Sequence, residues 1–253
     1  MATATAPSQA SAEARPLPGR RYDHRYFSLM AILVLVTVFI GFGPTYYWAG
    51  VFEAALPSPV IHVHGAVFSC WVLLLLVQTS LVSARRVDIH RRLGVAGFFV
   101  AGLMVILGLC AALNALVNHR TRGELDPRVF FVVPFTDILT FAGLIFFAMW
   151  YRKNSAAHKR LVLLATVALL TAAFARFHVG FLGGNIVHAM FMSDLFVIAL
   201  AAYDYWSTRT IQRATLLGGL FLVVVQYGRL PLSQTTGWMH FASWTQAHTG
   251  WLK

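Results

Sequence analysis

The sequence has few charged residues and very little lysine. Charged residues make up 11% of its 253 residues and hydrophobic residues 58%, a composition far too apolar for an ordinary soluble domain. The lysines are Lys153, Lys159 and Lys253, and none of them falls inside a long apolar run. A retinal Schiff base, which needs a lysine within the membrane, is therefore excluded. The sequence also lacks a phosphate-binding glycine loop and a serine-hydrolase elbow, so neither class of enzyme is indicated.

Cysteine is scarce as well. The sequence has two cysteines, Cys70 and Cys110, and both lie inside apolar runs. Free cysteine behaves as a small hydrophobic residue, so this placement favours two buried thiols over a disulfide.

Long apolar runs dominate the sequence instead. A membrane-spanning helix needs roughly 20 mostly apolar residues. Runs of about this length cover residues 27–48, 60–83, 94–117, 129–151, 161–182, 186–206 and 215–232. The connections between them are short, which favours one compact unit over several domains. We therefore predict an all-α protein with a bundle of seven transmembrane helices over residues 27–232.

The basic residues are distributed unevenly between the two ends of these runs. Fourteen lysines and arginines fall on the side of the N-terminus and four on the other side. Cytoplasmic loops carry such an excess, so the N-terminus is expected in the cytoplasm and the C-terminus outside. The net charge of +11 is then explained by contact with anionic headgroups on the cytoplasmic side. A nucleic-acid partner is not indicated.

The two flanking segments have different compositions from the apolar runs. Residues 1–26 are rich in Ala, Ser, Pro and Arg and lack apolar periodicity, which predicts a disordered cytoplasmic tail. Residues 233–253 contain Trp238, Trp244 and Trp251 among polar residues. They are too short and too polar to cross a membrane. This pattern predicts an interfacial aromatic segment on the outer face.

Polar side chains inside the runs gather in the predicted outer half. Such residues usually face the interior of a bundle and are functional candidates. They are His62, His64, Asp137, Arg176, His178, His188, Asp194, Gln226 and Arg229. In one interpretation, Asp137 and Asp194 pair with Arg176 and Arg229 as buried ion pairs, because the charges balance at similar depth. In the other, the same four residues have a functional role.

The run 60–83 carries two histidines whose directions differ. At about 100° per residue, His62 and His64 point to different sides of a helix. His64 shares a face with Trp71 and Gln78. A face with this composition is unusual against lipid, so we expect it to point into the bundle. His64 is therefore the favoured ligand, and His62 is either an interface residue or a second ligand from a loop.

One candidate for the cofactor is haem b. Axial haem ligation needs two neutral imidazoles from facing helices, with apolar and aromatic walls. His64 with His188 or His178 provides such a pair in the outer half, and Trp71 and Gln78 would line the site.

The other candidate is a transition metal, zinc or iron. Such a site takes about three histidine or carboxylate ligands and keeps a position open. His62, His64 and His188 offer imidazoles, and Asp137 or Asp194 offers a carboxylate. The spacing does not distinguish this site from a haem site.

A longer pattern resembles a known group of proteins. It contains His64-Gly65, Trp71, Gln78, Arg86 and the run His90-Arg91-Arg92-Leu93-Gly94, followed by His158-Lys159-Arg160-Leu161. This pattern resembles an uncharacterised family of bacterial multi-pass membrane proteins over the second to fifth runs. The resemblance implies a bacterial inner-membrane location and carries no assigned activity.

A weaker likeness is to the diheme cytochrome b membrane proteins that use ascorbate or similar donors. In those proteins a histidine begins one span, an arginine ends it, and a further histidine lies in the next span. His64, Arg86 and His90 are similar in order. This likeness implies haem ligation and electron transfer.

Three functions are therefore open at this point. The leading hypothesis is a haem- or metal-binding redox protein with an electron-transfer partner on the outer face. The alternative is a proton-coupled transporter or small-molecule sensor, in which the Asp and Arg residues form a proton relay or ligand clamp. The third is a metal-dependent membrane hydrolase.

Overall fold

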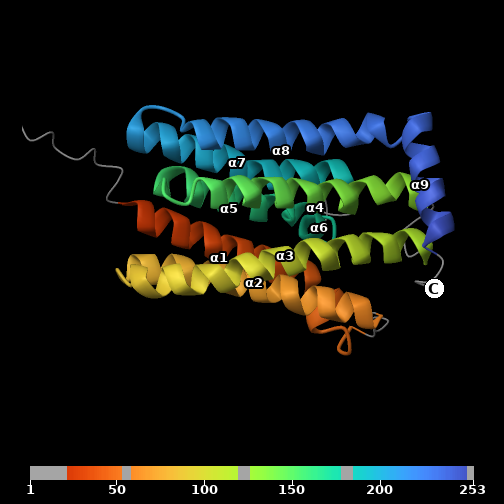
Figure 1. Cartoon of the computed structure of the whole chain (residues 1–253), viewed down its shortest axis with the longest axis horizontal. Helices are drawn as coiled ribbons and strands as arrows, with labels where there is room; N and C mark the ends of the chain where they lie inside the picture. The colour runs from red at the N-terminus through yellow and green to blue at the C-terminus, as the bar shows by residue number, and fades with distance from the viewer. Residues whose placement is uncertain (1–21, 53–57, 119–125, 178–184, 250–253) are drawn as a thin grey trace, which may run out of the picture.

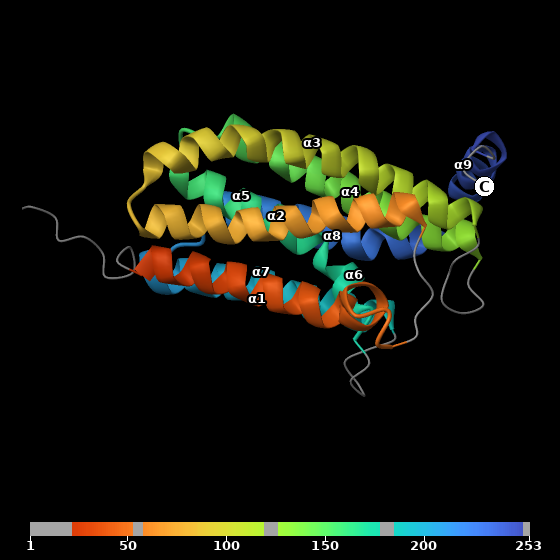
Figure 2. The ribbon, with the colours of Figure 1, turned by 90° about the horizontal axis from the view of Figure 1, so that it is seen from below.

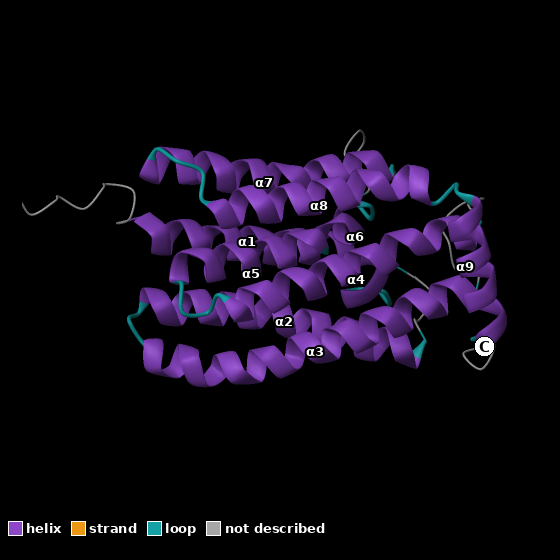
Figure 3. Cartoon of the chain, turned by 45° about the horizontal axis from the view of Figure 1, so that its top comes forward, coloured by secondary structure: helices purple, strands orange, loops and turns teal. Residues whose placement is uncertain are grey.

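The chain folds into a bundle of long helices. The computed structural model describes residues 22–52, 58–118, 126–177 and 185–249, and these form helices and connections without any strand (Figure 3). The long helices run side by side along the longest axis of the molecule (Figure 1). They are α1 (Asp23–Phe42) with a π-helical turn (Gly43–Tyr47), α2 (Pro59–Ser83), α3 (Val87–Val117), α4 (Pro127–Trp150), α5 (Ser155–Ala168) with α6 (Leu170–Phe174), α7 (Ile186–Thr208) and α8 (Arg213–Leu232).

Seven of the segments that the structure describes are long and apolar enough to cross a membrane, α5 and α6 counting as one. This confirms the predicted all-α architecture with seven candidate spans. The two cysteines are free, as expected. Cys70 is exposed on α2, however, and Cys110 on α3 is half-buried, so the prediction that both thiols are buried is wrong.

Asparagine and aspartate side chains begin three of the long helices. The side chain of Asp126 accepts a hydrogen bond from the Arg128 backbone nitrogen at 2.8 Å at the start of α4. Asn154 begins α5 and Asn185 begins α7 in the same way. These caps satisfy backbone N–H groups that have no partner within the helix. They fix where the chain re-enters the bundle after each connection.

The bundle is built around α5. This helix and α6 form the most deeply buried candidate span, with 67% of its most apolar stretch inside the protein. It packs against α1, α4, α7 and α8, and Figures 1 and 2 show it between the other helices. Small side chains such as Ala165 and Ala168 allow these helices to approach closely.

Several helices are irregular in the half of the bundle that ends at the C-terminal helix α9 (Thr236–His248). The fifth span is interrupted at Leu169, between α5 and α6. The Ser193 hydroxyl on α7 donates a hydrogen bond to the Val167 carbonyl beside this interruption at 3.0 Å. Pro134 lies inside α4, where it removes a backbone donor. Backbone geometry therefore departs from a regular helix near the buried polar groups described below.

Gly41 on α1 allows the first and fifth spans to touch. A Cβ atom at Gly41 would lie within 2.9 Å of three backbone atoms of Ala173 on α6. No side chain fits at this contact. The close approach fixes the position of α6 against α1.

The C-terminal helix α9 (Thr236–His248) lies across one end of the bundle (Figure 1). Its Trp238 indole donates a hydrogen bond to the Arg128 carbonyl at 2.8 Å, and its Gln246 amide donates one to the Leu116 carbonyl at 3.0 Å. These bonds attach it to the ends of α3 and α4. We call this the α9 end and the other the opposite end. The interfacial position predicted for residues 233–253 stays a prediction.

Some helix boundaries differ from those predicted. Helix α1 begins at Asp23, inside the segment predicted as a disordered tail, while residues 1–21 lie outside the described part of the chain. Helix α3 begins at Val87 rather than residue 94, and α5 begins at Ser155 rather than residue 161. The apolar runs cover only the most hydrophobic stretch of each of these helices. Their first turns contain basic residues, whose long side chains reach polar surroundings.

Candidate functional site

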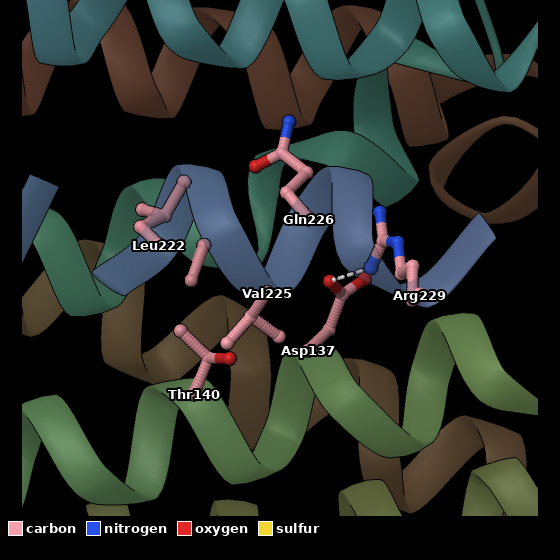
Figure 4. Close-up of a pocket in the computed structure, with 7 residues that line it drawn as sticks. Asp137, Thr140, Leu222, Val225, Gln226 and Arg229 are labelled. Carbon is pink, nitrogen blue, oxygen red and sulfur yellow. Dashed lines mark hydrogen bonds and ion pairs between the residues drawn. The ribbon is translucent and has the colours of Figure 1, made fainter. Parts of the chain in front are cut away.

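An ion pair joins α4 and α8 inside the bundle. Nη1 of Arg229 donates a hydrogen bond to Oδ1 of Asp137 and lies 3.4 Å from the Val133 carbonyl oxygen (Figure 4). The side chain of Arg229 is 1% exposed and that of Asp137 is 13% exposed. This is one of the ion pairs predicted from the sequence.

A small cavity adjoins this ion pair between α4, α5 and α8. It is lined by Asp137, Thr140, Ala168, Leu222, Val225, Gln226 and Arg229. The centre of a water molecule can move over about 10 Å³ there, which is the space that a single water needs. Four of the seven lining residues carry polar side chains, namely Asp137, Thr140, Gln226 and Arg229, and a polar group that enters can meet these partners.

Gln226 and Arg229 carry hydrogen-bond donors without partners. Nε and Nη2 of Arg229 and Nε2 of Gln226 are buried and bond to nothing. As a whole residue, Arg229 is 2% exposed, and Gln226 is 4% exposed. Their nitrogen atoms extend to the same side of α8 in Figure 4. An unsatisfied buried polar group costs about 1–3 kcal/mol. The fully buried atoms of Gln226 and Arg229 that have no partner are all donors, so these two residues are suited to a group that accepts hydrogen bonds.

Asp194 on α7 has a different partner from the one predicted. The Tyr227 hydroxyl on α8 donates a hydrogen bond to its Oδ2 at 2.8 Å, and its Oδ1 is buried without a partner. The predicted ion pair between this carboxylate and an arginine is not formed in the part of the chain that the structure describes. Tyr227 faces α7 at this height, whereas Arg229 is directed to α4.

Arg176 lies just beyond α6 and faces α1. Its Nη1 donates a hydrogen bond to the Ala172 carbonyl at 2.5 Å. Its guanidinium carbon lies 4.5 Å from the centre of the Phe42 ring. A cation over an aromatic face is a favourable contact. Arg176 therefore attaches the end of the fifth span to α1.

The two histidines of α2 differ in environment, as the helical geometry predicted. His62 is exposed, and its carbonyl accepts a hydrogen bond from the Tyr46 hydroxyl at 3.0 Å. His64 is directed inward, with its ring centre 4.0 Å from that of Phe68 and its imidazole facing the Leu107 backbone. Its Nδ1 is buried and has no hydrogen-bond partner. His64 thus keeps one ring nitrogen available.

The predicted haem-ligand pair is not assembled among the described residues. His188 is exposed on α7, which packs against α5, α6 and α8. His64 lies on α2, which packs against α1 and α3. The two imidazoles therefore do not face each other. His178, the other predicted partner, lies outside the described residues.

The predicted metal-ligand set is not brought together either. No group of three or more His, Cys, Asp or Glu side chains that could hold a metal ion occurs in residues 22–52, 58–118, 126–177 and 185–249. His62 and His188 are exposed, and Asp137 is held by Arg229. A metal-dependent hydrolase therefore has no assembled ligand set in this region.

Trp71 and Gln78 connect α2 to its neighbours. The Trp71 indole donates a hydrogen bond to the Thr166 hydroxyl on α5 at 3.1 Å. With its amide nitrogen turned towards α3, Gln78 donates to Nδ1 of His90 at 2.8 Å and accepts from the Gly94 nitrogen at 3.0 Å. Both side chains point towards other helices. Their donors are used in helix packing, so neither shows a ligand-binding role.

A second buried ion pair, which was not predicted from the sequence, lies at the opposite end of the bundle. Arg160 on α5 donates from Nε to Asp204 on α7 at 2.9 Å, and the two side chains are 3% and 0% exposed. Asp204 also accepts from the Thr215 hydroxyl at 2.5 Å and the Gln212 nitrogen at 3.1 Å. Asp204 lies within a predicted apolar run, and this position was the sequence signal that could have indicated the buried ion pair. Unlike Asp194, this carboxylate has partners for both oxygens.

A further set of contacts ties α1 into the opposite end. Lys159 forms an ion pair with Asp23 at 2.5 Å, and the Tyr203 hydroxyl donates to the same carboxylate at 2.7 Å. The Tyr26 and Tyr203 rings stack with their centres 3.8 Å apart. Together with the contacts of Asp204 to Arg160 and Thr215, these interactions connect α1, α5, α7 and α8 to one another.

The described part of the chain has seven helices that are long and apolar enough to span a bilayer, an architecture compatible with a multi-pass helical membrane protein. Comparison with models of protein families, with curated proteins and with solved structures found no match. We therefore infer the function from the geometry of the site.

Proposed function

We propose that this chain is a proton-coupled transporter of a small polar solute in the bacterial inner membrane. The solute would bind beside Asp137, Gln226 and Arg229. The observation that carries the proposal is the group of buried N–H donors without partners on Gln226 and Arg229. A purely structural ion pair gains nothing from such donors, since each one costs free energy when it is left unpaired. A bound solute that accepts their hydrogen bonds would recover this cost.

The orientation in this proposal follows from the charge distribution. The excess of arginine and lysine at the opposite end supports a cytoplasmic N-terminus and an outer C-terminus. Anionic headgroups of the cytoplasmic leaflet would contact these basic residues. The Asp137–Arg229 site then lies in the outer half of the membrane, and α9 lies on the outer face.

Two features of the bundle suit transport. The first is the presence of Asp137 and Asp194 within candidate spans, because intramembrane carboxylates serve as proton carriers in pumps and transporters. The second is the interrupted fifth span beside the site, since discontinuous helices commonly form transporter binding sites. The ion pairs Arg160–Asp204 and Lys159–Asp23 close the opposite end in this conformation. Release of solute into the cytoplasm would require them to separate.

The proposal is tested with purified protein and a panel of small solutes. Thermal unfolding in detergent is measured with sodium acetate, acetamide and methylammonium chloride at equal ionic strength. We expect at least one solute to raise the unfolding temperature. Acetic acid and methylamine cross a lipid bilayer in their neutral forms, so protein-free liposomes with the same trapped pH indicator are measured in parallel. Liposomes containing the protein should respond to that solute faster than the protein-free liposomes. Stabilisation without a faster response would indicate a sensor, and the absence of both would contradict the proposal.

A redox function with haem b or a transition metal is a second candidate. The observation that favours it is Nδ1 of His64, which is buried and has no partner. The absorption spectrum and the metal content of the purified protein test this candidate. A Soret band or bound iron or zinc that is lost in His64→Ala would support it. A colourless, metal-free protein would exclude it.

A further inference from the structure

The chemistry of the unpaired atoms restricts the class of solute. This inference rests on the proposed function and concerns the same site. Arg229 offers Nε–H and Nη2–H groups, and Gln226 offers an amide NH₂ group. A carboxylate is the ligand group that matches a guanidinium most closely, because its two oxygens accept parallel hydrogen bonds. Besides Asp137, the remainder of the cavity lining has one hydroxyl group, on Thr140, and the apolar side chains of Ala168, Leu222 and Val225. This favours a short monocarboxylate over a polyhydroxy compound.

Charge balance adds a second restriction. Arg229 and Asp137 together are neutral when both are ionised. A carboxylate that enters would leave the buried site with an uncompensated negative charge, which is costly away from water. Protonation of one carboxyl group restores neutrality. Asp137 is the carboxyl group that is already bound to the Arg229 guanidinium.

The elements around Asp137 offer few other charges. On α8 the charged group that faces it is Arg229. The charged residues of α3 and α5 all lie in the first six residues of each helix, at the opposite end. At the α9 end, Arg128 of α4 is paired with Asp126, and the histidines of α9, His240 and His248, are exposed. Arg229 and Asp137 therefore control the charge of the site.

We propose that the site binds the carboxylate of a short monocarboxylic acid through Arg229 and Gln226, and that Asp137 takes up one proton with it. The solute carboxylate accepts hydrogen bonds from Nε and Nη2 of Arg229, while Asp137 stays at Nη1. A proton from the solution neutralises Asp137, and no covalent bond of the solute is made or broken. The cavity has room for about a single water. Entry therefore requires the lining side chains to move, and Ala168 lies directly beside the interruption of the fifth span.

Proton uptake is the most specific test. Acetate is added to the purified protein in weak buffer with a pH indicator, and its binding is followed in parallel by calorimetry. We expect about one proton to be taken up per acetate bound. In Asp137→Asn the site carries a positive charge from Arg229 alone. Acetate should then bind without proton uptake. Acetate binding with no proton uptake in the wild type, or with unchanged uptake in Asp137→Asn, would overturn the coupling.

Gln226→Leu provides a test that does not depend on the ion pair. Nε2 of Gln226 has no partner to lose, so this variant is expected to fold. Acetate binding should weaken by roughly ten-fold or more, as expected for a lost hydrogen bond to a charged group. The matched control is Gln234→Leu, the same change at an exposed position. Unchanged acetate affinity in Gln226→Leu would overturn the assignment. If acetamide or methylammonium binds and no carboxylate does, this inference fails while the proposed transporter function stands.

Discussion

Arg229 holds Asp137 through one of its terminal nitrogens and leaves two other nitrogens of the same guanidinium without partners. Arginine usually binds a carboxylate bidentately, through two parallel hydrogen bonds. Here a second carboxylate would find unused donors on the same group. This geometry is the basis of the proposed site.

The Asp137–Arg229 ion pair should show strong energetic coupling. Asp137→Asn and Arg229→Gln each leave a buried charge without its partner, which costs about 3–5 kcal/mol. The double variant removes both charges and should be less destabilised than the sum of the single variants. Thermal unfolding of the four proteins in one detergent measures this coupling. Additive effects would show that the two side chains do not interact in the folded protein.

The Arg160–Asp204 ion pair should also contribute strongly to stability. Asp204→Asn leaves the buried guanidinium of Arg160 without a counterion, again at a cost of about 3–5 kcal/mol. The matched control is Asp88→Asn. Asp88 lies 3.8 Å from Arg86, and both side chains are more than half exposed. Exposed pairs contribute about 0–1 kcal/mol. Equal unfolding temperatures for the two variants would contradict the assigned burial.

Substitution of Gly41 should disrupt the contact between α1 and α6. In Gly41→Ala the new methyl group would lie 2.4 Å from the Ala173 carbonyl oxygen, so the backbone must shift. Overpacking of this kind costs about 1–3 kcal/mol. Gly102→Ala on α3 is the control, since no atom lies within 4 Å of its added Cβ. The control variant should unfold at the same temperature as the wild type or higher. A neutral Gly41→Ala would indicate that the two helices are further apart.

The seven candidate spans were predictable from the sequence because each is a long apolar run. The Asp137–Arg229 pair was predictable in part, since acidic and basic residues at similar depth tend to pair. The sequence did not indicate which arginine meets which acid. That choice depends on the rotation of each helix about its own axis, which also directs His188 to the surface.

Two further features had weak sequence signals. Arg160 follows Lys159 and Arg152 in a basic segment, which is typical of a membrane interface, so its burial against Asp204 was not anticipated. The interruption at Leu169 lies in a stretch without glycine or proline. Tertiary packing of α6 against α1 and α7 determines it, and such packing cannot be deduced from local sequence.

The central claim is that the unpaired donors beside Asp137 exist to bind a solute. The stability of Gln226→Leu without added solute tests it most directly, because binding and structure make opposite predictions. If Gln226 serves binding, the variant should unfold at the wild-type temperature or above it, since an unsatisfied buried amide is removed. The stabilisation by solute that the wild type shows should be lost. A variant that is clearly less stable and that retains the full response to solute would contradict the claim.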